Sequence, residues 1–114
     1  MPELLRFSVM GANDDIHEVT IERHENDSAN LTALCSCGDA QHGDFCSHRF
    51  EILEGDISNL ASENLDDIQV LRDWIKGSDI EAAMNELSMA KTDLKLAREK
   101  YAYCRNMLVR RMLD

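Results

Sequence analysis

The chain has 114 residues, an apolar fraction of 44% and a formal net charge of −10. This length provides one ordinary domain, or a small module followed by helices. The sequence contains no run of about 18 apolar residues, so no membrane-spanning helix is expected, and the net acidity argues against a protein that grips nucleic-acid phosphates over its whole surface.

Charge is distributed unevenly along the chain. Residues 90–114 contain seven Lys and Arg against three Asp and Glu, a net charge of +4, which leaves −14 for residues 1–89. Candidates for contact with a nucleic acid or an acidic partner are Lys91, Lys95, Arg98, Arg105, Arg110 and Arg111. The alternative is that the acidic charge keeps the protein soluble and that the basic side chains solvate one helix face.

The spacing of the cysteines and the first six residues give an expectation for the cellular compartment. Residues 1–6 have neither the basic leader nor the apolar core of a signal peptide. Three of the four cysteines lie within residues 35–46, which is typical of metal ligands and not of a secreted disulfide framework. We therefore expect a reducing compartment, with the cytoplasm as the first choice and the nucleus as the alternative.

Three strands are expected in the first third of the chain. Residues 4–10 have a rough strand pattern, residues 16–24 alternate and are rich in β-branched side chains, and residues 31–35 form a third short run. Strands joined by short turns favour an antiparallel meander. In the second strand, Val19 and Ile21 are expected to face the core.

Residues 35–48 carry the main chemical signal, a C-x-C pair followed after eight residues by a C-x-H pair. Three thiols and an imidazole in two tight pairs are what tetrahedral zinc binds. Gly38 and Gly43 can bend the intervening loop and bring the two pairs together. The candidate ligands are Cys35, Cys37, Cys46 and His48.

The spacing also indicates how the site is built and what competes with it. Cys35 and Cys37 end a strand, where residues two apart share a face, and Cys46 begins a short helix, whose start favours a thiolate. Four ligands close the coordination shell, so a structural zinc is expected and not a catalytic one. His42 is a rival fourth ligand, and His48 is preferred because its pairing with Cys46 repeats the first pair. Two other interpretations are a cluster of reduced core cysteines and a redox switch in which a C-x-C disulfide ejects the metal.

No enzyme motif is recognisable in the sequence. His17 and His24 are interpreted as polar strand residues, because neither belongs to an H-E-x-x-H motif. A phosphate-binding loop, a nucleophile elbow and paired carboxylates in a known frame are also missing. We therefore expect a protein that is not an enzyme and has no small-molecule substrate.

Residues 16–55 resemble, roughly over this range, the SWIM-type zinc finger. The resemblance rests on the order C-x-C, loop and C-x-H, with short strands before it, and on segment 46–53, in which an apolar helix follows the C-x-H pair. The resemblance implies a zinc ion held by the four candidate ligands in a small ββα-like fold. SWIM domains occur in bacterial helicase-like proteins, plant Mutator-type transposases and some signalling and recombination proteins, and they are proposed to bind DNA or proteins. Ser47 stands where the family often has a basic residue.

A second helix is expected over residues 63–76. Gly55 is expected to end the short helix before it, Ser62 to be its N-cap and Gly77 to end it. Its apolar stripe comprises Leu65, Ile68, Leu71 and Ile75. Trp74 stands near the edge of this stripe and is expected to be a core or docking anchor.

The longest expected element is a helix over residues 80–113, which contains no Gly or Pro and follows a capping box, S-x-x-E, that starts at Ser78. Its apolar positions alternate steps of three and four residues, the pattern of a coiled-coil seam. The seam comprises Ile80, Ala83, Leu87, Ala90, Leu94, Ala97, Tyr101, Cys104 and Leu108. Cys104 is interpreted as a buried filler of this seam and not as a ligand.

Such a helix would be roughly 50 Å long, at about 1.5 Å per residue, which is more than a module of this size can cover. We therefore expect a homodimer or a protein partner helix along residues 80–113. The alternative is a helix that packs back on its own sheet.

Together these elements predict an α+β fold: a small antiparallel β-meander with a zinc-bound short helix (ββα-like), followed by an α-helical region that ends in a long coiled-coil-like helix. The expected division is a SWIM-like zinc-binding module over residues 1–56 and a helical region over residues 57–114. The expected function is that of a zinc-binding interaction module that engages a protein partner or itself. The alternative is a DNA-binding protein that uses the zinc module and the basic C-terminal helix.

Overall fold

The structure is a computed structural model that describes residues 3–114. The chain divides into two compact units, the first ending at Glu81 and the second running from Ala82 to Asp114. We call the first unit the sheet module. Beyond residue 56, where a division of the chain was expected, a helix contributes Ile68 and Leu71 to the same hydrophobic core as the sheet.

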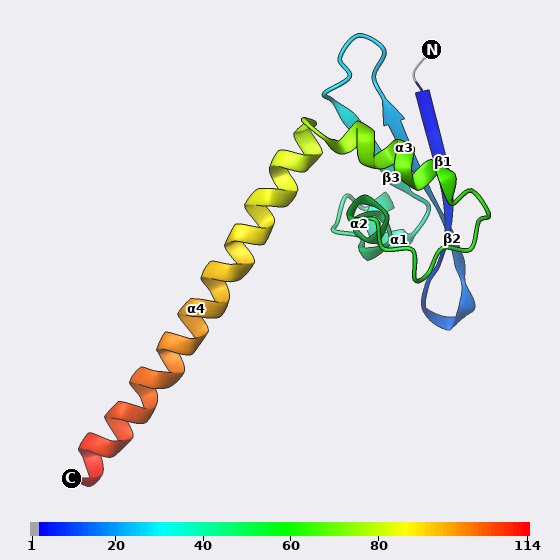
Figure 1. Cartoon of the computed structure of the whole chain (residues 1–114). Coiled ribbons are helices and arrows are strands. Elements are labelled where there is room, and N and C mark those ends of the chain that lie inside the picture. Colours follow the sequence, from blue (N-terminus) through cyan, green and yellow to red (C-terminus); the bar gives the residue numbers. More distant parts are fainter. Residues whose placement is uncertain (1–2) are drawn as a thin grey trace. The chain divides into compact units, whose positions relative to one another are not determined.

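A three-stranded antiparallel sheet forms the base of the sheet module (Figure 1). Its strands are β1 (Glu3–Met10), β2 (Ile16–Arg23) and β3 (Leu31–Cys35), in the order β1-β2-β3. In the register, Val19 of β2 lies opposite Phe7 on one side and Cys35 on the other. The expected meander and the α+β class are therefore confirmed.

The alternation of side chains along the strands selects one buried face. Val19 and Ile21 have no exposed surface, and Phe7 and Val9 are each 1% exposed. Residues two apart on a strand point to the same side, so these four apolar side chains form one continuous patch. The prediction that Val19 and Ile21 face the core is confirmed.

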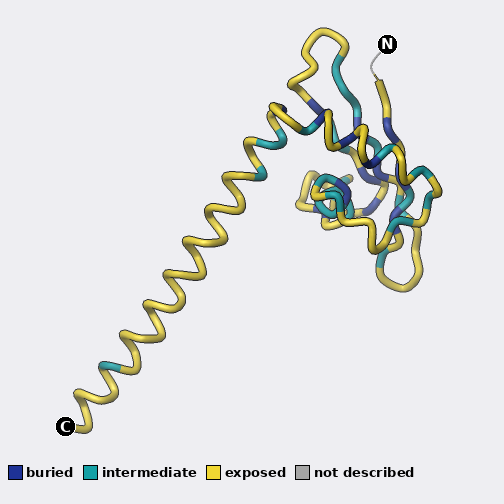
Figure 2. Tube along the Cα trace, in the orientation of Figure 1, coloured by how far each residue is buried: buried dark blue, intermediate teal, exposed yellow. Residues whose placement is uncertain are grey.

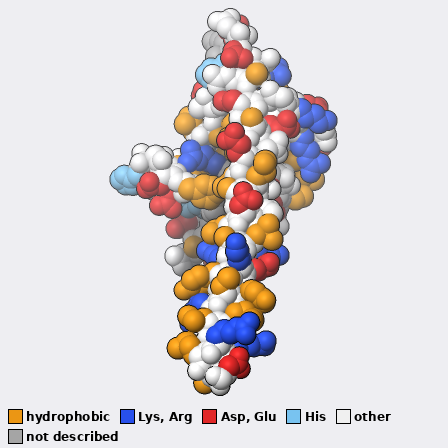
Figure 3. Space-filling view, turned by 90° about the vertical axis from the view of Figure 1, so that its left-hand side faces the viewer, with side chains coloured by type: hydrophobic (Ala, Val, Ile, Leu, Met, Phe, Trp, Pro, Cys, Tyr) orange, Lys and Arg blue, Asp and Glu red, His pale blue; other side chains and the backbone are white. Residues whose placement is uncertain are grey.

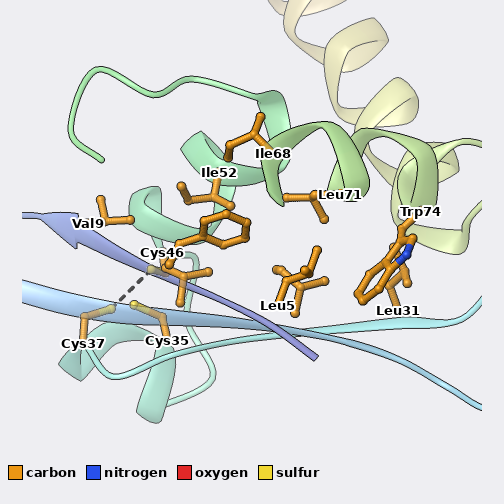
Figure 4. Close-up of a cluster of buried hydrophobic side chains, with 13 residues drawn as sticks. Leu5, Val9, Leu31, Cys35, Cys37, Cys46, Ile52, Ile68, Leu71 and Trp74 are labelled. Atoms are coloured by element: carbon orange, nitrogen blue, oxygen red, sulfur yellow. Dashed lines mark hydrogen bonds between the residues drawn. The ribbon is translucent and has the colours of Figure 1, made fainter. Parts of the chain in front are cut away.

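Short helices complete the core over this patch. They are α1 (Gly38–Gln41), α2 (Ser47–Glu54) and α3 (Asp66–Ile75), and a 3-10 turn η1 (Ala12–Asp14) connects β1 to β2. Figure 4 shows Ile52, Ile68 and Leu71 pointing from the helices toward the strands, with Trp74 beside Leu31. Trp74 is 7% exposed and is a core residue, as expected. The α2 helix ends at Gly55, whose φ of 80° is the left-handed conformation that favours glycine.

The start of α3 differs from the sequence expectation. The helix begins at Asp66, and Ser62 does not cap it. The Ser62 hydroxyl instead accepts a hydrogen bond from the backbone N–H of Ser8 (3.1 Å), and the N–H of Ala61 donates to the Ser8 carbonyl (2.7 Å). The open edge of β1 thus recruits this segment, because backbone groups at a sheet edge need hydrogen-bond partners.

The last helix, α4 (Asp79–Leu113), has 35 residues and an ordered start. The Ser78 hydroxyl accepts a hydrogen bond from the N–H of Glu81 (3.1 Å), and the Glu81 carboxylate accepts one from the N–H of Gly77 (3.1 Å). This arrangement is close to the capping box that the sequence predicts. No residue of α4 is buried, as Figure 2 shows by the exposed colour along most of the helix. No helix in the described part of the chain is long and apolar enough to cross a membrane.

Candidate metal centre

Four side chains meet where β3 ends and α2 begins. One ligand atom from each of Cys35, Cys37, Cys46 and His48 can be chosen so that all four lie within 4.8 Å of one another. Cys35 is the last residue of β3, Cys37 stands at the N-cap position of α1 without a side-chain capping hydrogen bond, and Cys46 caps α2. Figure 4 shows the three sulfurs converging below the apolar core. The structure therefore brings together the four residues that the sequence singles out.

The interatomic distances suit a tetrahedral zinc site. The sulfurs of Cys37 and Cys46 are 3.3 Å apart, and Nδ1 of His48 lies 3.5 Å from the Cys46 sulfur and 3.9 Å from the Cys35 sulfur. Zinc–sulfur bonds of about 2.3 Å in a tetrahedron place sulfurs about 3.8 Å apart. The sulfurs of Cys37 and Cys46 lie about 0.5 Å closer than that value, and no two of the four ligand atoms are more than 4.8 Å apart, so shifts of up to about an ångström would accommodate the ion.

The donors are largely shielded from water. Cys35, Cys37 and Cys46 are 9%, 6% and 3% exposed, and His48 is half-buried. Thiolate and imidazole donors are those that zinc prefers, and four of them leave no open position for water or substrate. The residues present therefore fit a structural zinc ion.

Cys46 has a second role as the N-cap of α2. Its sulfur accepts a hydrogen bond from the backbone N–H of Arg49 (3.5 Å), which is one of the donors left unpaired at a helix start. A thiolate at this position is also stabilised by the positive end of the helix dipole. The expectation that Cys46 stands at a helix start is confirmed.

Arg49 is a functional candidate that the sequence reasoning missed. Its guanidinium donates to the carbonyl of Ala33 in β3 (3.1 Å) and to the carbonyl of Asp44 in the loop between the ligand pairs (2.9 Å). Arg49 therefore ties the strand with one ligand pair to the loop and helix with the other. Its position after the C-x-H pair is the only sequence signal for this role.

His17 and Gly11 form the outer support of His48. The rings of His17 and His48 have centroids 4.5 Å apart and planes inclined by 33°. A Cβ atom at Gly11 would lie 2.8 Å from the His17 ring and 3.0 Å from Nε2 of His48. Nε2 therefore points toward Gly11 while Nδ1 faces the sulfurs. The expectation that His17 is only a polar strand residue misses this ring contact, for which no local pattern exists.

Burial and hydrogen bonding move the thiol pKa values in opposite directions. Desolvation raises the pKa of Cys35 to about 12, and the neighbouring Cys37 and Cys46 thiols add to the effect. Desolvation also opposes ionisation of Cys37, but hydrogen bonds from the Ala40 backbone and then from Cys46 and His48 outweigh it and lower the pKa of Cys37 to about 6. In the metal-free site, the first thiolate to form is therefore that of Cys37.

The remaining candidate residues lie outside this cluster. His42, the rival ligand, is exposed and does not belong to it. His24 lies one residue beyond the end of β2, outside the strand in which it was expected, and its Nε2 lies 2.8 Å from the hydroxyl of Thr32 in β3. Cys104 is exposed on the single chain, so the expected burial of its side chain is not present without a partner. The six candidate basic residues of α4 are exposed.

A shallow apolar hollow lies beside the metal centre. Ala33, Phe50 and Leu53 contribute to its lining, and Phe45 stands at its rim with 67% of its surface exposed. The rings of Phe45 and Phe50 have centroids 5.5 Å apart. Phe50 is half-buried, so Phe45 is the exposed member of this aromatic pair. An exposed aromatic side chain at the rim of an apolar hollow is a typical feature of a protein-binding surface.

Comparison with known proteins identifies no relative. No family model matches this chain, and no curated protein or solved structure matches it.

Proposed function

We propose that this chain is a zinc-binding interaction module of the SWIM type, in which the metal is structural and the long helix engages a protein partner. The observation that carries the proposal is the buried cluster of three sulfurs and one imidazole nitrogen, all within 4.8 Å of one another. The ligand order and the strand, loop and helix that carry it support the SWIM resemblance.

The role of the zinc ion follows from what its ligands connect. Cys35 ends β3, whereas Cys37 lies beyond the strand in which the sequence placed it, at the start of α1. Cys46 and His48 lie at the start of α2. When bound, zinc supplies a cross-link between these two segments and neutralises the thiolates. In small zinc-finger peptides such a site contributes roughly 10–16 kcal/mol to folding. Because four protein donors close the shell, the proposed role of the metal is structural and not catalytic. We propose an interaction module and not an enzyme.

Two surfaces support binding to another protein. The first is the hollow beside the metal centre, with the exposed Phe45 at its rim. The second is α4, where Leu94, Tyr101 and Leu108 are 50%, 65% and 61% exposed. Large apolar side chains repeated along one helix indicate an interaction site. The reduced thiols that the metal needs suit a reducing compartment, and we propose the cytoplasm.

A second candidate function is DNA binding through the basic residues of α4. Their exposure and the net charge of +4 over residues 90–114 favour it. The excess of acidic residues in the sheet module disfavours it, as does Ser47 in place of a basic residue in the metal loop. A gel-shift series from low to high salt decides between them: binding that weakens steeply with salt supports contact with phosphates, and no binding at low salt removes this candidate.

Native mass spectrometry of protein purified without added metal tests the zinc site. We expect one zinc per chain, loss of the metal with a strong chelator, and unfolding of the sheet module in the same sample. Cys46→Ser should reduce zinc occupancy, whereas the matched Cys104→Ser, which lies outside the cluster, should retain it. A metal-free chain that keeps its folded sheet would overturn the proposal.

A further inference from the structure

The seam of α4 is continuous and exposed. From Asp79 to Leu113 the helix has no break, and its large seam residues from Leu87 to Leu108 are 36% to 65% exposed. Figure 3 shows hydrophobic side chains along the visible face of this helix, with Lys, Arg and acidic side chains between them. In heptad notation, Ile80, Leu87, Leu94, Tyr101 and Leu108 occupy position a, and Ala83, Ala90, Ala97 and Cys104 occupy position d.

We propose that α4 pairs with α4 of a second copy of this chain, with the two helices parallel and in register. This inference rests on the proposed role of α4 as an interaction helix and names its partner. The apolar repeat alone indicates only that some helix covers the seam. The charges that flank the seam select the partner and its direction.

The flanking positions e and g differ in charge. Position e carries Lys91, Arg98 and Arg105, whereas position g carries Glu86 and Asp93 and then Lys100. In a parallel pair, position g of one helix faces the next position e of the other. Glu86 therefore faces Lys91 of the second copy, and Asp93 faces Arg98. Only Lys100 meets a like charge, at Arg105, so opposite charges outnumber like charges by two to one on each side of the seam.

An antiparallel pair gives a poorer match. In an antiparallel pair, position e of one helix faces position e of the other, and position g faces position g. The two seams are in contact along the whole helix when Leu94 packs against Ala97 of the other copy. Arg98 then meets Lys91, while Asp93 meets Lys100. The favourable pair of Asp93 with Lys100 is therefore offset by the unfavourable pair of Arg98 with Lys91. Packing of the apolar seam is compatible with either direction, so charge decides for the parallel one.

Cys104 distinguishes the two directions by its position. In a parallel pair in register, residues at position d face their own counterparts across the seam, so the two Cys104 thiols of a dimer are adjacent. In the antiparallel pair Cys104 faces Leu87 instead. A thiol-specific oxidant such as diamide, which takes up the two hydrogens, therefore joins the chains through Cys104 only in the parallel arrangement.

The first experiment measures assembly and cross-linking on the full zinc-loaded chain. We expect sedimentation at tens of micromolar to give twice the chain mass of 13.0 kDa, and diamide to give a covalent dimer that Cys104→Ser abolishes. A monomer, a larger assembly, or a dimer that fails to cross-link would overturn the inference. Zinc content is measured on the same sample, so loss of the helix pair with zinc retained is distinguished from failure of the metal site.

The second experiment reverses single charges on α4. Arg98→Glu places like charges opposite Asp93 in the parallel pair, so the dimer dissociation constant should rise about tenfold, since the two-fold symmetry creates two such contacts. In the antiparallel pair the same change faces Lys91 and would strengthen the dimer. Adding Asp93→Lys to Arg98→Glu should restore the wild-type constant.

Glu99→Lys is the matched control for Asp93→Lys, because both change the charge by two units but residue 99 lies at position f, away from the seam. Asp93→Lys should weaken the dimer and Glu99→Lys should leave it unchanged. Equal effects of the two variants would show that net charge and not pairing controls assembly, and would overturn the proposal. Circular dichroism confirms that each variant keeps its helix.

Discussion

The sheet module and α4 differ in where their stability comes from. The sheet module buries thirteen apolar residues, from Leu5 to Trp74, and gathers three sulfurs at one end of that core. The 35 residues of α4 include none that is buried. Burial of apolar surface and metal ligation can hold the first region as a single chain, whereas the second depends on local helix propensity and on what covers its seam. The same chain thus combines a unit that has its own hydrophobic core with a helix that has none.

The largest expected effect comes from removing a ligand. Cys46→Ser takes away one metal donor and the N-cap of α2, so amides of residues 3–81 should lose most of their protection against hydrogen exchange, while those of residues 82–114 keep their wild-type rates. The apparent binding energy at stake is roughly 10–16 kcal/mol. Cys104→Ser, the same chemical change in the other region, should leave the sheet module protected. Equal protection of the sheet module in both variants would contradict the assigned ligands.

Truncation of the core should have the next largest effect. Phe7 is 1% exposed and Phe45 is 67% exposed, so Phe7→Ala should lower the free energy of unfolding of the sheet module by about 3–5 kcal/mol and Phe45→Ala by less than about 0.5 kcal/mol. Trp74, the only tryptophan of the chain, reports this transition by its fluorescence in urea. A similar loss for both variants would show that the core is placed wrongly.

Acidification should weaken metal binding in a predictable direction. Cys35, whose pKa is raised to about 12, must release a proton when zinc binds, whereas Cys37, whose pKa is lowered to about 6, is already ionised at neutral pH. The zinc affinity should therefore fall at least tenfold for each pH unit below neutrality, since one proton released on binding gives about a tenfold change, and more steeply below about pH 6 where Cys37 also takes up a proton. Competition with a chromogenic chelator at several pH values measures this slope. An affinity independent of pH would exclude thiol ligands.

A smaller effect on the metal is expected from the support of His48. A methyl group at Gly11 would lie 3.0 Å from Nε2 of His48, whereas one at Gly38 meets nothing within 4 Å. Gly11→Ala should push the imidazole and reduce zinc affinity by about tenfold, the scale of changes around metal ligands. Gly38→Ala, although it lies next to the ligand Cys37, should leave the affinity unchanged. Equal affinities for the two variants would show that the ring can shift freely.

The smallest expected effect concerns the start of α4. Ser78→Ala removes the hydroxyl that accepts the N–H of Glu81 and donates to the carbonyl of Ile75 (2.6 Å), at a position that is 4% exposed. The loss of this cap should cost the sheet module about 1 kcal/mol in urea unfolding monitored by Trp74. Ser88→Ala, in the exposed middle of α4, is the control and should change that value by no more than a few tenths of a kcal/mol. An unchanged free energy of unfolding for Ser78→Ala would mean that water replaces the hydrogen bonds of the cap.

Local patterns were sufficient to predict most elements and the ligand set. Alternation identified β2, the paired spacing of Cys35 to His48 identified the cluster, and Ser78 with Glu81 identified the start of α4. These signals depend on residues that are close in sequence. The contacts that were missed depend on residues far apart, because only the fold brings Gly11 to His48 or the guanidinium of Arg49 to β3.

The start of α3 was predicted wrongly because it, too, depends on a contact between residues far apart in the sequence. Serine is a residue type that favours the N-cap position, but the Ser62 hydroxyl accepts a hydrogen bond from the edge of β1 instead. This tertiary hydrogen bond prevails over the local preference. The contribution of α3 to the core of the sheet module was missed for a related reason. An amphipathic helix gives no sign of which core it joins, and α3 joins that of the sheet.

The first residue of α4 is fastened to the loop between β2 and β3. The N–H of Asp79 donates to the carbonyl of Ala29 (2.8 Å), and the Asp79 carboxylate accepts from the N–H of Leu31 (3.1 Å). A protease that trims the chain should therefore be stopped before it reaches this residue and should leave a resistant fragment ending near Glu81. A shortened chain that stops at Gly77 would release the loop, so the minimal expressible domain includes the opening turn of α4.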